Sequence, residues 1–240
     1  MLGIISGTVL LHKPGLLDEA EETVKINEFG AAVLLISDTI AFIPRHGMDP
    51  QNHTLPHLIN HRASLKALQD IGVTEVIGIN SAGSLKKKIR PGTVIIPDDF
   101  IMFAPCPSTH DNKAAHITPG LDTAIRRRCL EAARACGIGA MDGGTYWQTT
   151  GPRLETKAEI RMMSRFADIV GMTMASEAII AKELALPYAS ICSVDNYAHG
   201  IGENELTMEK ISAHALLSGK TITRILVAYI QSSGSYCVTT

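Results

Sequence analysis

Short apolar runs alternate with amphipathic segments along nearly the whole chain. Most of these runs are rich in Val and Ile and end in Gly, Ser, Asn or Pro, which is typical of strands covered on both faces. Between the runs, apolar residues recur at the spacing of an α-helix, and two of these segments stop at a glycine. We therefore predict strands over 2–6, 31–37, 39–44, 75–80, 92–97, 167–172 and 188–194, and helices over 61–72, 121–137, 175–186 and 206–230.

This alternation predicts a single α/β domain over residues 1–231, with a mostly parallel sheet flanked by helices. The polar residues 232–240 are expected to form a frayed C-terminal tail. The longest irregular stretch, 102–120, contains three prolines and two histidines, and long loops in compact domains are often functional.

Composition narrows the functional classes. With 22 Lys and Arg against 24 Asp and Glu, the net charge is −2, which gives no global attraction for nucleic acid or membranes. The five cysteines are scattered without a C-x-x-C pair, which argues against a zinc site or a disulfide framework and favours a reducing compartment. No apolar run approaches the ~20 residues of a membrane span, and the N-terminus lacks the basic start of a signal peptide. We therefore expect a soluble, cytoplasmic protein with no nucleic-acid or membrane partner.

Small and polar residues follow the first predicted strands, at the strand ends where open α/β sheets bind ligands. Gly7 permits a sharp turn, and Thr8 offers a hydroxyl and an N–H to an anion. Arg45 and His46 follow the strand 39–44, and an arginine can hold a phosphate with two parallel N–H groups. An ordinary strand-ending turn and a solvated arginine are the alternatives at these two places.

Two later segments have the same character. Ser81, Ala82 and Gly83 follow the strand 75–80 and expose backbone N–H groups that can bind an anion. Glu155 lies in a turn beside Leu154 and is a candidate site residue. Alternatively, its carboxylate only stabilises the first turn of the helix that follows.

The last two strand ends complete the set. Met172 and Thr173 come at the end of the strand 167–172, and a methionine there can also be core packing. Asp195 and Asn196 end the final strand as turn formers or ligand-reading side chains. No nucleophile–base pair, metal spacing or cofactor fingerprint accompanies these segments. The combination suits an enzyme that binds an anion and a polar heterocycle and works by positioning them.

The motifs SGT, PRHG, HRASLKAL, NSAGSL, GPRLET-AE and VGMT-ASE, in that order, are specific as a set. From residue 2 to residue 230 the chain resembles the trimeric branch of the purine nucleoside phosphorylase and methylthioadenosine phosphorylase family. The resemblance implies an α/β fold with a central mixed sheet, and a phosphorolysis reaction. Phosphate attacks C1′ of a purine nucleoside through an oxocarbenium-like transition state, which gives the free base and a sugar 1-phosphate. Phosphate is then a co-substrate, and the resemblance implies neither a metal nor a cofactor.

The resemblance also implies the site residues and a homotrimer. His46, Glu155 and Asn196 would take part in catalysis, and His116 would reach into the site of a neighbouring subunit. The implied phosphate contacts are Thr8, Arg45, His46, Ser81 and Thr173. The implied nucleoside contacts are Ala82, Gly83, Leu154, Glu155, Met172, Asn196, Met208 and His116.

Two features depart from the family pattern near the phosphate. The first loop of the family usually reads G-G-T-G, whereas Val9 stands here at the last glycine, so a less open loop is expected. Residues 48–52 (MDPQN) are inserted before His53.

The purine end separates the subclasses of the family. Adenine-reading members have an acid at the position of Asn196 and a second acid at the position of Ala198. An amide cannot protonate N7, and Glu155 can accept from the N1–H that a 6-oxopurine has and adenine lacks. The pair therefore favours hypoxanthine or guanine, unless the alignment slips by one residue and Asp195 takes that place.

The 5′ end gives the second criterion. By alignment Met208 and Ile211 form an apolar wall there, which fits a methylthio group. The resemblance is therefore closest to the S-methyl-5′-thioinosine phosphorylase subgroup. The alternatives are a methylthioadenosine phosphorylase, a nucleosidase of the same fold that uses water, and a non-catalytic purine sensor.

Overall fold

The computed structural model describes the chain except residues 8–9, 11–15, 113, 203–207 and 233–240, and at 50 and 208–212 it describes only the backbone. Within the described residues, eleven strands form one sheet. Eight strands follow one another in the order β2-β3-β4-β1-β5-β10-β9-β7, while β11 pairs with β5 and β6, and β8 pairs with β6. Six strand pairs are parallel and four are antiparallel. The predicted mixed, mostly parallel sheet is confirmed.

The strands are β1 (Leu2–Ser6), β2 (Glu21–Asn27), β3 (Gly30–Ile36), β4 (Ile40–Pro44), β5 (Glu75–Ser84), β6 (Val94–Ile96), β7 (Asp99–Met102), β8 (Ala140–Asp142), β9 (Thr145–Gln148), β10 (Ile169–Gly171) and β11 (Tyr188–Tyr197). The helices are α1 (His61–Asp70), α2 (Thr123–Ala135), α3 (Lys157–Met163), α4 (Met174–Glu183) and α5 (Met208–Ser232). Two short 3-10 turns, η2 (Pro50–Asn52) and η3 (Pro56–Leu58), lie before α1, and η2 belongs to the inserted residues 48–52.

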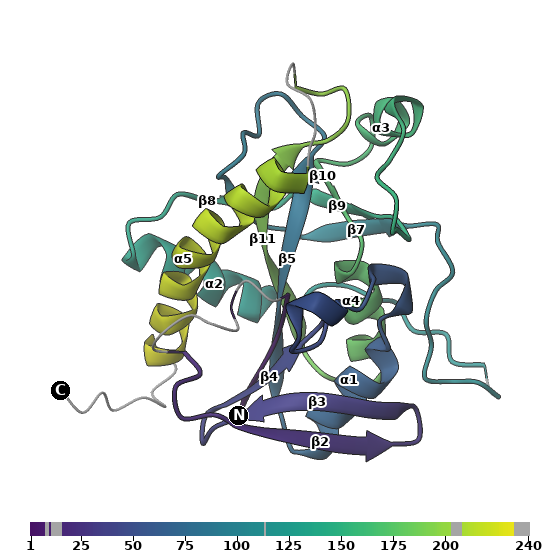
Figure 1. The fold of residues 1–240 in the computed structure, drawn as a ribbon, viewed down its shortest axis with the longest axis vertical. Helices are drawn as coiled ribbons and strands as arrows, with labels where there is room; N and C mark the ends of the chain where they lie inside the picture. Colours follow the sequence, from purple (N-terminus) through teal and green to yellow (C-terminus); the bar gives the residue numbers. More distant parts are fainter. Residues whose placement is uncertain (8–9, 11–15, 113, 203–207, 233–240) are drawn as a thin grey trace.

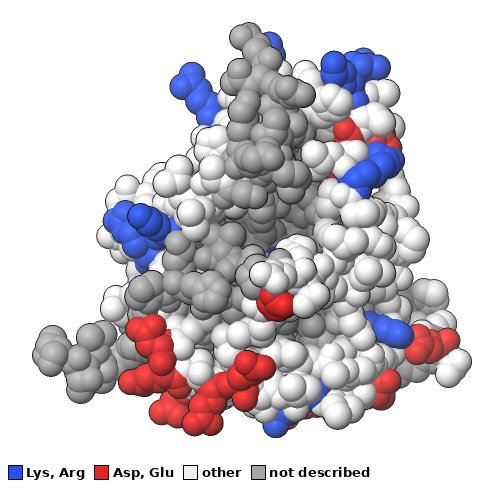
Figure 2. All heavy atoms as spheres, viewed as in Figure 1, with Lys and Arg blue, Asp and Glu red and all other residues white. Residues whose placement is uncertain are grey.

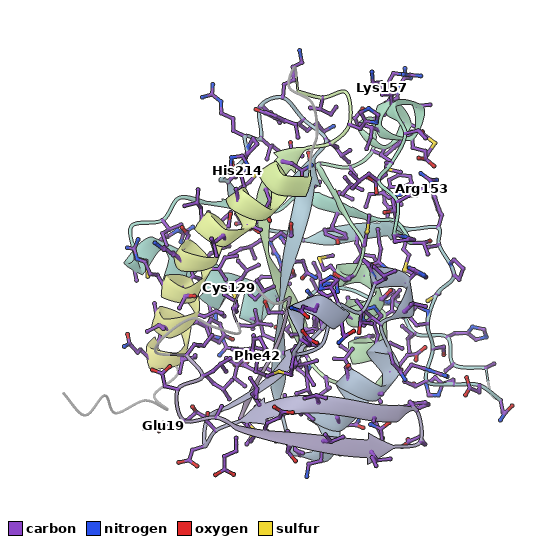
Figure 3. All side chains as sticks on the ribbon, in the orientation of Figure 1. Glu19, Phe42, Cys129, Arg153, Lys157 and His214 are labelled. Carbon is purple, nitrogen blue, oxygen red and sulfur yellow. The ribbon has the colours of Figure 1, made fainter. Side chains whose placement is uncertain are left out.

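Helices cover both faces of the central sheet. The helices α2 and α5 pack together on one face, and α1 and α4 on the other (Figure 1). In β1, Ile4 packs in the cluster that holds Cys129 of α2, whereas Ile5 packs in the cluster that holds Leu65 of α1. Because successive side chains of a strand point to opposite faces, a strand covered on both faces is apolar at every position. Figure 3 labels Phe42 and Cys129 in the first of these clusters.

The start of α3 is fixed by a reciprocal pair of hydrogen bonds. The hydroxyl of Thr156 accepts from the N–H of Glu159, and the carboxylate of Glu159 accepts from the N–H of Thr156. This capping box satisfies two backbone donors that the first turn leaves without partners. The first-turn charge of α3 is therefore that of Glu159, and Glu155 lies before the helix.

The structure differs from the sequence prediction at several strands. The edge strand β2 was missed because most of its side chains are exposed, so it has no apolar run. The short strands β7, β8 and β9 were also missed. β5 and β11 continue to Ser84 and Tyr197, beyond their predicted ends. As a result, the small and polar residues expected in turns after these two strands are held inside the sheet.

Residues 103–122 contain no helix or strand in their described part. The helix α5 ends at Ser232, and the remainder of the predicted tail lies outside the described residues, so the tail and the domain limits stay predictions.

Over the described ranges, none of the helices has the length and apolar character needed to cross a bilayer. On the face drawn in Figure 2, Lys and Arg side chains lie in separate groups, and acidic side chains gather along the lower edge.

Candidate active site

The candidate site lies at the edge of the sheet where neighbouring parallel strands end. β1 is parallel to β4 and to β5, and β5 is parallel to β11, so their carboxyl ends share one edge. The strand register pairs Ser6 with Pro44 and Ser81 with Ser193. Arg45 follows Pro44 directly, and its side chain reaches the backbone of both β1 and β5, as described next.

The Arg45 side chain is buried in a two-point ion pair with Glu177 of α4. Nε donates to Oε1 of Glu177 at 2.5 Å, and Nη2 donates to Oε2 at 3.2 Å. Nη1 donates to the carbonyl of Ile79 at 2.9 Å, and Nη2 donates to the carbonyl of Ile5 at 3.2 Å. Burial opposes the charge, but the carboxylate of Glu177 holds the pKa of Arg45 above its ordinary value. The N–H fork that the sequence suggested for phosphate is thus bound to protein groups in this structure.

His46 lies beside Gly7, the residue that follows β1. A methyl group built on Gly7 would stand 3.5 Å from its Cδ2, and its ring stacks on that of His53 with centroids 4.1 Å apart. Nδ1 lies 2.7 Å from the carbonyl oxygen of Thr54, and because a carbonyl only accepts, Nδ1 carries the proton of the neutral ring. Burial, and then the charge of Arg45, lower the pKa of His46 to about 4. Nε2 is then an acceptor, which suits the hydroxyl of a protonated phosphate.

His61, the first residue of α1, is a second histidine held in its neutral form. It is 8% exposed, and burial, followed by the charges of Arg45 and His46, lowers its pKa to about 3. His61 opens the motif HRASLKAL, but the sequence analysis assigned it no role in the site.

The free energy of unfolding should fall as the pH is lowered from 7 to 5. In the unfolded chain a histidine binds a proton near its ordinary pKa of about 6.5, whereas folded His61 binds one only near 3. Between these values the unfolded state holds more protons, so acid favours unfolding, by at most about 1.4 kcal/mol per pH unit for each such histidine. Urea unfolding at pH 7 and pH 5 measures the dependence. His61→Gln should weaken the change of the unfolding free energy with pH, whereas His57→Gln, at an exposed histidine, should leave that change as it is. The same pH dependence in all three proteins would contradict the role of His61.

Asn80 of β5 holds the segment that carries Thr173. Its Nδ2 donates to Oγ1 of Thr173 at 2.9 Å, and its Oδ1 accepts from the hydroxyl of Ser190 in β11 at 2.7 Å. Since Asn80 uses Thr173 as an acceptor, the hydroxyl proton of Thr173 remains available to an anion. A methyl group built on Gly171 would stand 3.1 Å from the carbonyl oxygen of Ser81, so β10 and β5 approach closely here. Thr173 and the exposed Ser81 therefore lie on adjoining strand ends.

Glu155 and Met172 adjoin the same strand end. The hydroxyl of Thr149 donates to Oε1 of Glu155 at 2.7 Å, and the N–H of Thr149 donates to the carbonyl of Gly171 at 2.9 Å. Thr149 thereby ties the mostly buried Glu155 carboxylate to the end of β10. Gly151 has a φ of +67°, and a methyl group built on it would stand 2.6 Å from Sδ of Met172. Glycine alone fits that backbone conformation and that close approach to Met172.

A β-bulge in β11 sends Asp195 and Asn196 in different directions. The pairing with β5 shifts at this point, so that Asn196 pairs with Gly83. Its Nδ2 would stand 3.0 Å from a methyl group built on Gly83 and donates to the carbonyl of Tyr197 at 2.9 Å. Asn196 therefore lies directly against the Ala82–Gly83 segment.

Asp195 points into the protein instead. It is fully buried, and its carboxylate accepts from the hydroxyls of Ser193 at 2.9 Å and of Ser218 in α5 at 2.8 Å. Burial raises the pKa of the Asp195 carboxyl, although hydrogen bonds from Ser81, Ser218 and Ser193 oppose the shift. Asp195 is thus engaged by serines, whereas Asn196 lies against Gly83, and that Asn196 reads the purine stays a prediction.

A hollow of about 280 Å³ reaches Glu155 from the outside. Its walls come from the end of β7, from β9, from the segment 149–155 and from α3. On one wall Phe103 packs edge-to-face on Trp147, with centroids 5.4 Å apart. Arg153, labelled in Figure 3, lies on the rim and donates to both oxygens of Glu159 at 2.9 and 2.7 Å.

Four residues predicted for the site are not brought into this arrangement. Thr8 lies outside the described residues, as does the side chain of Met208. His116 is exposed in the loop 103–122. Leu154 is 40% exposed beside Glu155.

Sequence reasoning missed Glu177 and Thr149, which hold two of the predicted site residues. The sequence did carry a signal for Glu177. It is the one acid among residues 174–181, which are otherwise apolar or small, and that whole stretch is buried. A carboxylate in such a helix needs a buried partner. Thr149 had no comparable signal.

The described residues contain no group of three or more His, Cys, Asp and Glu side chains placed to hold a metal ion. That the protein needs no metal or cofactor stays a prediction.

The fold and the site together describe an α/β protein with two kinds of polar group at one edge of its sheet. Arg45, His46 and Thr173 can bind an anion, and beside them Glu155 and Asn196 can form hydrogen bonds with a heterocycle. A family model described as Phosphorylase superfamily matches residues 2–231. A probable 6-oxopurine nucleoside phosphorylase of Archaeoglobus fulgidus is 40% identical over 231 residues, 94% of each chain. A probable S-methyl-5′-thioinosine phosphorylase of Methanothermobacter thermautotrophicus is 40% identical over 223 residues, 88% of this chain and 76% of that relative.

The chain belongs to the phosphorylase superfamily. The resemblance seen in its motifs, and the expectation of an enzyme, are confirmed. Among solved structures, methylthioadenosine phosphorylase from Schistosoma mansoni in complex with adenine superposes with a TM-score of 0.86 at 22% identity, over 99% of this chain and 93% of that one. This similarity confirms the nucleoside phosphorylase fold.

Proposed function

We propose that this protein is a purine nucleoside phosphorylase for 6-oxopurine nucleosides, with the 5′-methylthio nucleoside as the preferred form. Phosphate is the co-substrate, and the products are the free purine and ribose 1-phosphate or its 5-methylthio derivative. The observation that carries the proposal is the adjoining of Arg45, His46 and Thr173 with Glu155 and Asn196 at one sheet edge. The names of the relatives, 6-oxopurine nucleoside phosphorylase and S-methyl-5′-thioinosine phosphorylase, support the same substrate class.

On the phosphate side, the neutral His46 accepts the hydroxyl hydrogen of the phosphate through Nε2, and the hydroxyl of Thr173 and the backbone of Ser81 donate to its other oxygens. Arg45 adds one N–H donor, and Thr8 is expected to add another. These groups hold a phosphate oxygen in line with C1′, and positioning of this kind is the main contribution of a site without a nucleophile.

On the purine side, Glu155 accepts from N1–H and Asn196 donates towards N7. As the phosphate oxygen bonds to C1′, the C1′–N9 bond breaks and its electron pair goes to the purine. Hydrogen bonds to N7 and to the 6-oxo group stabilise this developing anion, which takes up a proton after release. Met172 packs against the ribose, and the expected apolar wall of Met208 and Ile211 receives the 5′ group.

A nucleoside panel with and without phosphate tests the proposal. Inosine, guanosine, adenosine, methylthioadenosine and methylthioinosine are each incubated with the enzyme, and base release and sugar 1-phosphate are measured. Turnover of methylthioinosine that requires phosphate supports the proposal. Release of base without phosphate would indicate a nucleosidase, and tight purine binding without turnover would indicate a sensor.

The protein should be a trimer in solution. The hollow beside Glu155 has an exposed apolar rim that includes Phe103, which is 83% exposed, and Met162, with Phe166 close by, and such surfaces are typical of interfaces. Light scattering measures the mass, and Phe103→Lys should shift it towards the monomer. Ile26→Lys is the matched control, since Ile26 is equally exposed on the β2 edge strand. An active wild-type monomer would contradict the trimer and the shared-site role of His116. The cytoplasmic location stays a prediction.

A further inference from the structure

Most of the donors of Arg45 are already used by the protein. A guanidinium has five N–H groups in a planar fork. Nε and one N–H of Nη2 face the two oxygens of Glu177, and the second N–H of Nη2 and one of Nη1 face the carbonyls of Ile5 and Ile79. Among the described residues, only the second N–H of Nη1 has no acceptor. Arg45 therefore offers one directed donor to the site and no fork.

The orientation of that donor depends on Glu177. The carboxylate is fully buried, and it also accepts at Oε2 from the hydroxyl of Tyr188 at 2.7 Å. A methyl group built on Gly78 would stand 2.0 Å from the Tyr188 oxygen and 2.8 Å from Oε2 of Glu177. The absence of a side chain at Gly78 thus makes room for the Tyr188–Glu177 contact under β5. Tyr188 thus anchors the Glu177 carboxylate, and the carboxylate in turn holds the guanidinium of Arg45 against the backbone of β1 and β5.

We infer that Glu177 is a positioning residue for phosphate, which fixes the Arg45 guanidinium so that its remaining Nη1 donor meets the co-substrate. The inference rests on the proposed function. A second consequence is that Glu177 cancels the charge of Arg45, so Arg45 contributes a directed hydrogen bond more than a net positive charge. In Glu177→Gln the amide oxygen can accept from one N–H of Arg45, but the amide NH2 is a donor and faces the other N–H. Only one of the two hydrogen bonds between the side chains can then form.

The chain contains a matched control for this substitution. Glu75, the first residue of β5, also accepts from two nitrogens of one arginine, Arg128, and from a tyrosine hydroxyl, that of Tyr229 at 3.0 Å. It lies six residues before Ser81 along the strand, a distance of about 20 Å. Glu75→Gln changes the same chemistry at the opposite end of β5.

The test is steady-state kinetics of the wild type, Glu177→Gln and Glu75→Gln with varied phosphate and varied nucleoside. Phosphate-dependent turnover of the wild type is established first. If the wild type shows none, the proposed function is overturned, and this result is distinct from a failure of the role inferred for Glu177. The inference predicts that Glu177→Gln raises KM for phosphate about tenfold or more, the value of one charge-assisted hydrogen bond, with KM for the nucleoside changed less than about twofold. Glu75→Gln should leave both KM values unchanged.

The alternatives give different results. If Glu177 only stabilises the fold, Glu177→Gln lowers the melting temperature and kcat and leaves KM for phosphate unchanged. If it acts only by cancelling charge, KM for phosphate falls. Either result overturns the inference. Should Glu177→Gln fail to fold, Tyr188→Phe keeps the carboxylate and removes one of its anchors, and it should raise KM for phosphate in the same selective way; an unchanged KM in that variant would also overturn it.

Discussion

Methylthioinosine should be cleaved with at least roughly tenfold higher kcat/KM than methylthioadenosine. General-acid assistance to a leaving group is typically worth about 10²–10⁴-fold, and an adenine leaving group needs it at N7. The family resemblance implies that Asn196 stands in place of the acid of adenine-reading members, and its amide can donate a hydrogen bond but not a proton. A 6-oxopurine spreads the developing charge onto O6, where hydrogen bonds can hold it.

The measurement is the ratio of kcat/KM for the two methylthio nucleosides in the wild type and two variants. Asn196→Asp should shift the ratio towards adenine, because it supplies a titratable group and places negative charge near O6. Asp195→Asn is the matched control on the neighbouring residue. Its carboxylate is held by Ser193 and Ser218, so the ratio should stay at the wild-type value even if overall activity falls. A wild-type preference for methylthioadenosine would contradict the assignment of a 6-oxopurine.

The sequence predicted the sheet best where strands are buried on both faces. β1 and β4 are buried at every position because helices cover them on both sides, and their predicted ranges, 2–6 and 39–44, agree with the structure to within one residue. β5 begins at the predicted residue 75, where its apolar run lies, but it continues through small and polar residues to Ser84. The edge strand β2 escaped prediction for the opposite reason, since solvent lets its side chains be polar. Short strands such as β8 form through pairing with β6, and pairing leaves no pattern in one segment read alone.

The site could be predicted as far as strand ends and motifs reach. Arg45, Thr173 and Asn196 each stand next to a predicted strand, and parallel strands bring such residues to one edge. The partner of Arg45 lies 132 residues further along the chain, so its choice of Glu177 depends on tertiary packing. The bulge at Asp195 is likewise a property of the pairing between β11 and β5, and it decides which of two adjacent polar side chains faces Gly83.

Replacing Arg45 alone should destabilise the protein far more than a phosphate contact would explain. Arg45→Met leaves the Glu177 carboxylate buried without its charge partner, and breaking a buried ion pair from one side costs about 3–5 kcal/mol. Replacing the whole buried group in Arg45→Met/Glu177→Leu/Tyr188→Phe removes the stranded charge and the unpaired hydroxyl together. Apolar groups of similar volume can substitute for a buried ion pair at little cost, so the triple variant should recover most of the loss. Urea unfolding of the wild type, the single variant and the triple variant measures the three free energies.

Arg128→Met provides the comparison that separates burial from chemistry. Arg128 makes the same kind of two-point contact with Glu75, but their side chains are 31% and 20% exposed, against 3% and 0% for Arg45 and Glu177. Water can solvate Glu75 once its partner is gone, so this loss should stay near the value for exposed pairs, about 1 kcal/mol or less. Equal losses for the two single variants would show that Glu177 is reached by water or takes up a proton when Arg45 is missing. The site would then have kept its structure without the Arg45 side chain. A raised KM for phosphate in an Arg45 variant could therefore be assigned to the lost Nη1 donor alone.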